Sequence, residues 1–234
     1  MNQNLQNKKG LVQKVFNKVY DKYDLMNDFM SIGIHRLWKK NMINWMAPGP
    51  KKNLIDMACG TGDIGKLFLE NTNYEGSVLF IDPNSKMIKK GVEKFKSHKN
   101  ISWKKGSAEK IPAACNCFDY YCISFGLRNT DNINKSIKEA YRVLKPGGRF
   151  FCLEFSKVQN ILFVKIYKKY SKLIPHIGKI VVGEKYPYEY LVESIENFIN
   201  QEELIELMKK NYFVKCEYRN LSGGIVAIHS GWKI

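Results

Sequence analysis

The sequence predicts an α/β fold with a mostly parallel, Rossmann-like sheet that ends in an antiparallel hairpin. Short apolar strand patterns recur between residues 51 and 156, with helical patterns between them. A glycine-rich turn, Gly60-Thr61-Gly62, follows the first of these strands and precedes a helix. Near the end of the chain, SGGIVAIHS follows KNYFVKCEYRN, which is the pattern of two strands joined by a glycine turn.

Composition indicates one large domain. The 234 residues are 44% hydrophobic, enough to bury a sizeable core. The sequence contains no run of 18 or more apolar residues, and its start has no secretory or transit pattern. A cytosolic protein is therefore expected. The six cysteines have no disulfide-framework spacing, and no zinc cluster can be assembled from them and the four histidines. Reduced thiols and no metal site are predicted.

The net charge of +16 suits a nucleic acid, an anionic membrane surface or an acidic substrate. Most of the basic residues are lysines spread along the whole chain, whereas surfaces that clamp RNA tend to use arginine forks. A solvated lysine-rich surface is at least as good an interpretation. No nucleic acid partner is expected.

The first strand and helix carry the strongest ligand-binding signal. KKNLIDMACGTGDIGKLFLEN predicts a strand ending near Met57, a glycine turn and a helix from about Asp63. GSVLFIDPNSKM supplies the second strand, with Asp82 at its tip, where a carboxylate can accept hydrogen bonds from a ribose. This pattern alone does not separate a nicotinamide dinucleotide from another adenosyl cofactor.

Asp56 discriminates between these cofactors. It lies just inside the turn, where a carboxylate suits an ammonium group better than the two phosphates of a dinucleotide. S-adenosylmethionine carries both an ammonium and a sulfonium. An acid at this position therefore favours S-adenosylmethionine.

The next elements predict three further strands. ISWKKGSAEKIP, FDYYCISFGLRN and RFFCLEFS each contain one, and a helix ending RVLKPGG lies before the last. An acid follows the third strand and polar residues end the fourth. In this order the elements resemble a class I S-adenosylmethionine-dependent methyltransferase, whose sheet ends in an antiparallel pair. Alone, the glycine turn could be a tight corner and Lys145-Pro146-Gly147-Gly148 a helix stop.

The similarity then becomes specific. YDLMNDFMSIGIHRLWKK and RVLKPGGRFFCLEFS resemble the two signatures of the ubiquinone and menaquinone biosynthesis C-methyltransferases of the UbiE type. ISFGLRN, YLVESIENF and GIVAIHSGWK also match, so the resemblance covers nearly the whole chain from about Val15. Cys59 departs from it, because these enzymes commonly have glycine there. The resemblance implies C-methylation of 2-polyprenyl-6-methoxy-1,4-benzoquinol or of demethylmenaquinol.

One methyltransferase domain is expected over the whole chain. Its parts are an N-terminal helical cap at 1–50, a cofactor-binding core at 51–156, a helical cap insertion at 157–200, and a C-terminal helix and hairpin at 201–234.

The cofactor contacts are predicted at the carboxyl ends of the strands, where open α/β sheets bind ligands. The resemblance places them on Thr61, Asp82, Ser107, Ala108 and Ser124. The residues themselves add the backbone of Gly60 and Gly62 and the carboxylate of Asp56.

The resemblance also implies that a ring carbon is methylated, and this carbon becomes nucleophilic when a neighbouring hydroxyl loses its proton. Arg128 is the leading candidate to stabilise the phenolate or to orient a water that takes the proton, with Asn129 beside it. The alternative is that Arg128 caps the strand or pairs with a structural acid. Tyr23, Asp24 and Asn27 are expected to contact the ring, and His35 is a minor candidate.

The segment from Tyr20 to Met46 is predicted to be both helical packing and substrate cap. Within it, Met42 and Met46 share a helix face. The lysine-rich stretch at 161–195 suits contact with the inner face of a membrane, where a polyprenyl quinol resides, and a solvated surface helix is the competing reading. A homodimer or a quinone-biosynthesis complex would be ordinary for the family. The rival functions are an RNA methyltransferase and a non-catalytic cofactor-binding subunit.

Overall fold

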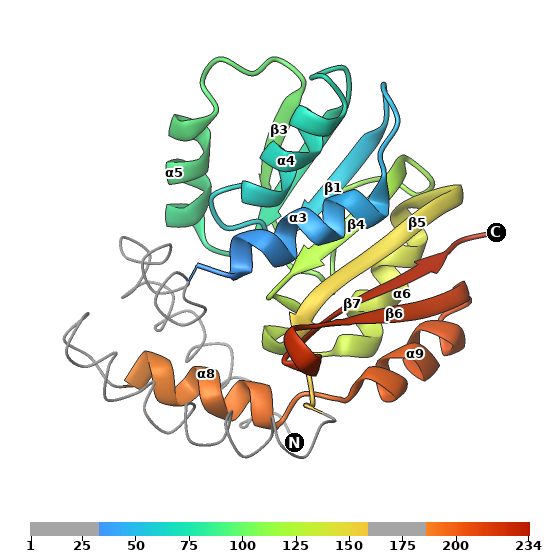
Figure 1. Cartoon of the computed structure of the whole chain (residues 1–234). Coiled ribbons are helices and arrows are strands. Elements are labelled where there is room, and N and C mark those ends of the chain that lie inside the picture. The colour runs from blue at the N-terminus through green and yellow to red at the C-terminus, as the bar shows by residue number, and fades with distance from the viewer. Residues whose placement is uncertain (1–32, 159–185) are drawn as a thin grey trace.

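The computed structural model describes residues 33–158 and 186–234 of the chain. Within this part a seven-stranded sheet has the order β3-β2-β1-β4-β5-β7-β6 (Figure 1). The strands are β1 Asn53–Met57, β2 Ser77–Asp82, β3 Ile101–Lys105, β4 Phe118–Ser124, β5 Leu144–Phe155, β6 Val214–Leu221 and β7 Val226–Trp232. The neighbours among β1 to β5 pair in parallel, and β7 pairs antiparallel with both β5 and β6. The predicted fold class is confirmed.

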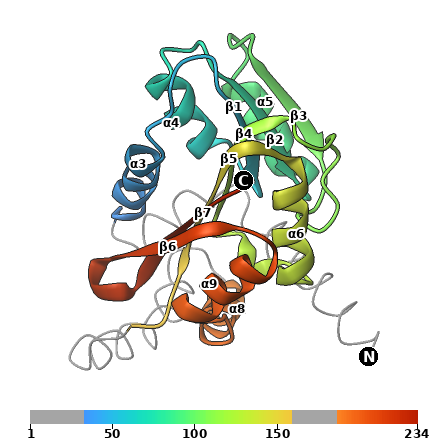
Figure 2. The ribbon, with the colours of Figure 1, turned by 90° about the vertical axis from the view of Figure 1, so that its right-hand side faces the viewer.

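Helices cover both faces of this sheet. The α-helices are α3 His35–Met46, α4 Asp63–Asn71, α5 Ser85–Lys94, α6 Ile133–Val143, α8 Tyr186–Glu196 and α9 Gln201–Lys210, with short 3-10 turns at η2 Leu127–Asn129 and η3 Ser222–Gly224. Figure 2 shows α3 and α4 on one side of the sheet and α6 on the other. A separate hydrophobic core fills the space on each side.

Asparagines start three of the helices. The side chains of Asn84, Asn132 and Asn200 accept hydrogen bonds from backbone amides in the first turns of α5, α6 and α9. Asn200 forms a capping box with Glu203. These caps satisfy amides that a helix end leaves unpaired, so local sequence fixes where the helices begin.

The first β–α unit forms as predicted. β1 ends at Met57 and α4 begins at Asp63, and β1 is buried on both faces, as expected for a central parallel strand. Met42 and Met46 of α3 are both buried, which confirms their shared packing face. The remainder of the predicted cap segment, residues 20–32, lies outside the described residues.

The fifth strand differs from the prediction. It begins at Leu144, so Lys145-Pro146-Gly147-Gly148 forms its irregular first part as well as following the helix. Gly147 has a φ of 79° and its amide donates to Lys233 O at 2.8 Å, while the Lys233 amide donates to Gly148 O at 2.9 Å. Pairing with the residue after β7 thus extends β5 through a sequence whose local pattern is that of a helix stop.

No helix in residues 33–158 and 186–234 is long and apolar enough to cross a membrane.

Candidate active site

The turn after β1 uses left-handed backbone conformations. Ala58, Gly60 and Gly62 have φ values of 53°, 56° and 90°. A Cβ on Gly62 would lie 2.9 Å from the Phe95 ring, so this position requires glycine for space as well as for conformation. The left-handed alanine stores strain at the corner of the sheet where ligands of this fold bind.

Cys59 occupies the turn without distorting it. Its backbone closes the turn, because the Cys59 amide donates to Ile81 O at 3.1 Å and its carbonyl accepts from the Gly62 amide at 2.9 Å. Burial raises the pKa of the Cys59 thiol well above its usual value, so the side chain is a neutral thiol. The departure from glycine at this position leaves the turn intact.

Asp82, at the tip of β2, is tied to the same turn. Its Oδ2 accepts from the Gly60 amide at 2.9 Å and its Oδ1 from the Asn84 amide at 2.8 Å. The side chain is buried, and burial raises its pKa to about 6. The tip of β2 and the glycine turn therefore form one unit.

Asp56 is more deeply buried, on β1 itself. Its Oδ2 accepts from the Gly65 amide at 3.0 Å, and its Oδ1 accepts from the Cys122 thiol at 3.5 Å. Burial raises its pKa to about 7. Two poorly solvated carboxyl groups at one edge of the sheet favour a ligand with positive charge, as the cofactor prediction requires.

Ser124 gives an independent sign of a missing polar partner. It is the last residue of β4, and its Oγ is buried without a hydrogen-bond partner in residues 33–158 and 186–234. Unpaired buried hydroxyl groups are rare in folded proteins. Together with the acidic pair and the glycine turn, this donor set fits S-adenosylmethionine.

The loop after β3 reaches the same edge. The Gly106 amide donates to Asp82 O at 3.2 Å, and Ser107 bridges to Lys110. Ala108 is buried, as is Thr61 of the glycine turn. The turns after β1, β2 and β3 thus bring the predicted cofactor residues to one edge, and their individual contacts with the cofactor stay predictions.

The turn after β4 packs directly against the turn after β1. A Cβ on Gly126 would lie 2.6 Å from Ala58 Cβ, so glycine is required for this approach. Phe125, before it, has a φ of 54°. The close packing places Arg128 and Asn129, both in η2, next to the cofactor turn.

Arg128 pairs with a buried acid. Its Nη1 lies 2.7 Å from Glu154 Oε1, and their side chains are 7% and 1% exposed. The Arg128 amide also donates to Glu154 Oε2 at 3.3 Å. The pairing that the alternative interpretation describes is therefore present, and the role of Arg128 in the reaction stays a prediction.

Helix α8 covers this turn with two side chains. The Tyr190 hydroxyl donates to Asn129 Oδ1 at 3.1 Å, and Arg128 Nε donates to Ser194 Oγ at 3.3 Å. Glu154, Tyr190 and Ser194 were not among the residues predicted from the sequence. Only Glu154 had a visible signal, as the one acid within the apolar run FFCLEF.

Helix α3 closes the site from another direction. The Trp38 indole packs against Phe125 and Phe155, with ring centroids 6.1 Å and 6.3 Å away. Its Nε1 donates to Ser222 Oγ at 2.9 Å, beside the hairpin. His35 of the same helix is buried and has interaction partners. Tyr23, Asp24 and Asn27 lie outside the described residues.

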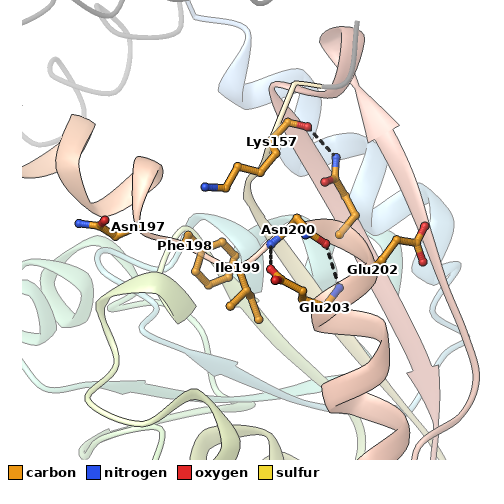
Figure 3. A pocket seen from close by; sticks show the side chains of 8 residues that line it. Lys157, Asn197, Phe198, Ile199, Asn200, Glu202 and Glu203 are labelled. Carbon is orange, nitrogen blue, oxygen red and sulfur yellow. Dashed lines mark hydrogen bonds between the residues drawn. The ribbon is translucent and has the colours of Figure 1, made fainter.

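A groove lies beside the end of β5 and contains none of the predicted cofactor or catalytic residues. Several of its polar groups bond to one another: Gln201 Nε2 donates to Lys157 O at 3.1 Å, and the Asn200 amide donates to Glu203 Oε2 at 2.7 Å. Its lining residues, drawn in Figure 3, are Lys157, Asn197, Phe198, Ile199, Asn200, Gln201, Glu202 and Glu203. Among the described residues no group of three or more His, Cys, Asp or Glu could hold a metal ion.

Comparison with known proteins places the chain in a family. The model of the ubiE/COQ5 methyltransferase family matches residues 2–233. The "Ubiquinone/menaquinone biosynthesis C-methyltransferase UbiE" of Rickettsia akari (strain Hartford) is 48% identical over 97% of this chain and 94% of its own length. The protein of that name from Brucella abortus (strain S19) is 45% identical, over 97% and 87%.

A solved structure supports the fold. The crystal structure of a SAM-dependent methyltransferase from Thermotoga maritima superposes with a TM-score of 0.66 at 18% identity, covering 95% of this chain and 99% of that one. The family model spans almost the whole chain, and the site's geometry agrees with it. The chain therefore belongs to the ubiE/COQ5 methyltransferase family.

Proposed function

We propose that the protein methylates a ring carbon of 2-polyprenyl-6-methoxy-1,4-benzoquinol in ubiquinone biosynthesis, with demethylmenaquinol as a second acceptor. The observation that carries this proposal is the nearly full-length similarity to C-methyltransferases of ubiquinone and menaquinone biosynthesis. The cofactor is S-adenosylmethionine, which supplies a methyl group on a sulfonium.

The turn after β1 and the tip of β2 would hold this cofactor. Gly60 and Gly62 allow the backbone to approach a ligand, and the Asp82 carboxylate is an acceptor for ribose hydroxyl groups. Asp56 adds a second buried carboxyl group nearby, and the Ser124 hydroxyl has no hydrogen-bond partner among the described residues. Thr61, Ser107 and Ala108 complete the proposed contacts.

On the substrate side, the chain must favour loss of the phenolic proton while the ring carbon attacks. The guanidinium of Arg128 offers only donors, so it acts as a hydrogen-bond donor to the developing phenolate or to a water that takes the proton. Asn129 is proposed to fix the ring together with Tyr23. The positions of Trp38 and of α8 around this turn support a site that excludes water.

A cytosolic protein in peripheral contact with a membrane fits this substrate. The net charge of +16 supports attraction to anionic lipid, and a polyprenyl chain partitions into bilayers. Sedimentation with phosphatidylglycerol and phosphatidylcholine vesicles tests this contact. Binding to the anionic vesicles that weakens with salt is expected, and equal recovery with both lipids would contradict it.

A methyl-transfer assay tests the reaction itself. Purified protein, S-adenosylmethionine with a labelled methyl group and reduced polyprenyl-methoxybenzoquinol in detergent are incubated beside a parallel reaction with demethylmenaquinol. The expected product is a ring-methylated quinol identified by mass, and the ratio of the two rates gives the quinone type. If neither quinol is methylated by protein that binds the cofactor, the proposal fails and total RNA is the next acceptor to test.

Arg128→Lys is the informative variant in this assay. Loss of the guanidinium fork should lower kcat roughly 100-fold, as removal of an oxyanion donor does in other enzymes. Arg142→Lys is the matched control, because Arg142 also pairs with a carboxylate, that of Glu139 at 2.7 Å, and its hydrogen-bond partners among the described residues include none of the proposed site residues. It should leave kcat near the wild-type value.

A further inference from the structure

The Arg128 guanidinium has five N–H donors, and the fold uses three of them. Nη1 donates to Phe125 O and to Glu154 Oε1, both at 2.7 Å, and Nε donates to Ser194 Oγ at 3.3 Å. No hydrogen bond from Nη2 to another described residue accompanies these three. Since the side chain is only 7% exposed, the described residues hold the fork firmly and leave Nη2 without a partner among them.

Glu154 is the centre of this arrangement. Its carboxylate accepts from Arg128 Nη1 and, through backbone amides, from Arg128 at 3.3 Å and Phe155 at 2.9 Å. With 1% of its side chain exposed, it has little room to rotate away. It thus binds both the backbone and the side chain of Arg128.

The ion pair also limits what Arg128 can do. A guanidinium that faces a buried carboxylate at 2.7 Å forms a pair with little net charge. The effect of Arg128 on a ligand then depends mainly on the direction of its free N–H groups and only weakly on its positive charge. The surrounding residues must therefore hold Nη2 in one orientation.

We propose that Glu154 is a positioning residue, which holds Arg128 so that Nη2 alone donates to the quinol oxygen or to the water that takes its proton. This inference rests on the proposed function. Glu154 acts through Arg128 and does not touch the substrate. The Glu154 carboxylate balances the charge of the Arg128 guanidinium and also fixes its orientation.

The first test is Glu154→Gln, which keeps the size of the side chain but loses the charge. We expect kcat to fall roughly 10- to 100-fold, because a small displacement of a catalytic donor has effects of this size. The KM for the quinol and the Kd for S-adenosylmethionine should change by less than about threefold, since neither binding contact is removed. Unchanged kcat would overturn the inference.

A double variant separates positioning from general support of the fold. If Glu154 acts through Arg128, then Arg128→Lys combined with Glu154→Gln should be no slower than Arg128→Lys alone, within about threefold. A structural role would instead make the losses multiply. Multiplied losses would therefore overturn the inference.

Glu139→Gln is the matched control, because Glu139 also pairs with an arginine but forms no hydrogen bond with η2 within the described part of the chain. Its kcat should match that of the wild type. Should Glu154→Gln not fold, Glu154→Asp keeps the charge and draws the carboxylate back by one methylene group. It should fold and lose about 10-fold in kcat; wild-type kcat in that variant would overturn the inference.

The wild-type protein is measured in the same assay. Its failure to methylate either quinol would defeat the proposed function and the inference together. An active wild type with fully active Glu154 variants would defeat the inference alone.

Discussion

The Asp82 carboxylate accepts a hydrogen bond from the Gly60 amide at 2.9 Å, which joins the tip of β2 to the glycine turn after β1. This contact aligns the turn and the carboxylate that are proposed to bind the cofactor. We expect Asp82→Asn to raise the Kd for S-adenosylmethionine about 10- to 100-fold, because a charged acceptor is lost. Titration calorimetry measures this change.

Asp119→Asn is the control for that experiment. Asp119 also accepts a hydrogen bond from a backbone amide, that of Asn53 at 2.9 Å. It lies at the start of β4, however, at the opposite end of that strand from the cofactor site. It should lower stability without changing the Kd. Equal affinity of the Asp82 variant and the wild type would remove Asp82 from the cofactor site.

The stability of the ligand-free protein should depend on pH through Asp56. Burial raises the pKa of this carboxyl group from 3.8 to about 7. The native state therefore binds a proton that the unfolded state has lost, so the contribution is fully present below about pH 4 and is lost as the pH rises through about 7. The free energy of unfolding should fall from about pH 4 to about pH 7 and then level off, with a total fall on the order of a few kcal/mol.

Urea unfolding of the wild type and of Asp56→Asn measures this effect, since their difference cancels the other groups. Asp82, with a pKa raised by burial to about 6, also makes the free energy of unfolding fall as the pH rises. Burial lowers the pKa of His229 from 6.5 to about 4, so this residue makes the free energy of unfolding rise with pH between these two values. A difference that stays constant across this range would contradict the prediction.

Ser124→Ala should have opposite effects on stability and on binding. The Ser124 hydroxyl is buried without a partner in the part of the chain that the structure describes. Its removal should therefore leave the free energy of unfolding within about 0.5 kcal/mol of the wild-type value or increase it. The Kd for S-adenosylmethionine should rise roughly 3- to 10-fold if the hydroxyl bonds to the cofactor. Thermal unfolding and calorimetry measure the two quantities.

Ser136→Ala provides the comparison, because the Ser136 hydroxyl is buried but donates to Asn132 O at 3.0 Å. It should cost about 1 kcal/mol of stability without a change in Kd. Unchanged affinity in Ser124→Ala would show that its hydroxyl has no role in cofactor binding.

Gly126→Ala should disturb the packing of two turns. The new Cβ would lie 2.6 Å from Ala58 Cβ, and neither group can move without a backbone shift. We expect a loss of about 1 to 3 kcal/mol in stability together with weaker cofactor binding. Thermal unfolding with and without S-adenosylmethionine measures both.

A second substitution should rescue this variant. Ala58→Gly removes the opposing methyl group and suits the φ of 53° at that position. Gly49→Ala, where a Cβ would meet nothing within 4 Å, is the neutral control. If the double variant is no more stable than Gly126→Ala, the clash between the two residues is not the cause.

Local signals in the sequence were sufficient for the first half of the sheet. The glycine turn and the acid at the end of β2 follow from short patterns, and the structure places them where those patterns predict. The Leu144–Gly148 part of β5 could not be predicted in this way. Its strand character comes from pairing with Lys233, which is distant in the sequence, while its own residues favour a turn.

The surroundings of Arg128 show the same limit. The sequence identified the residue, but its partners Glu154 and Ser194 are 26 and 66 positions away. Such side-chain pairs depend on the tertiary fold, and no periodicity reports them. An acid within an apolar strand was the only local sign that Glu154 had a special environment.

The two hydrogen bonds between α8 and η2 have a consequence for exchanging parts between relatives. Because Tyr190 and Ser194 bond to Asn129 and Arg128, a chimera that replaces residues 157–200 also replaces half of each contact. The donor segment must therefore carry a hydroxyl at both positions, or the recipient turn must be changed with it. In this enzyme the segment that contains α8 cannot be exchanged independently of η2.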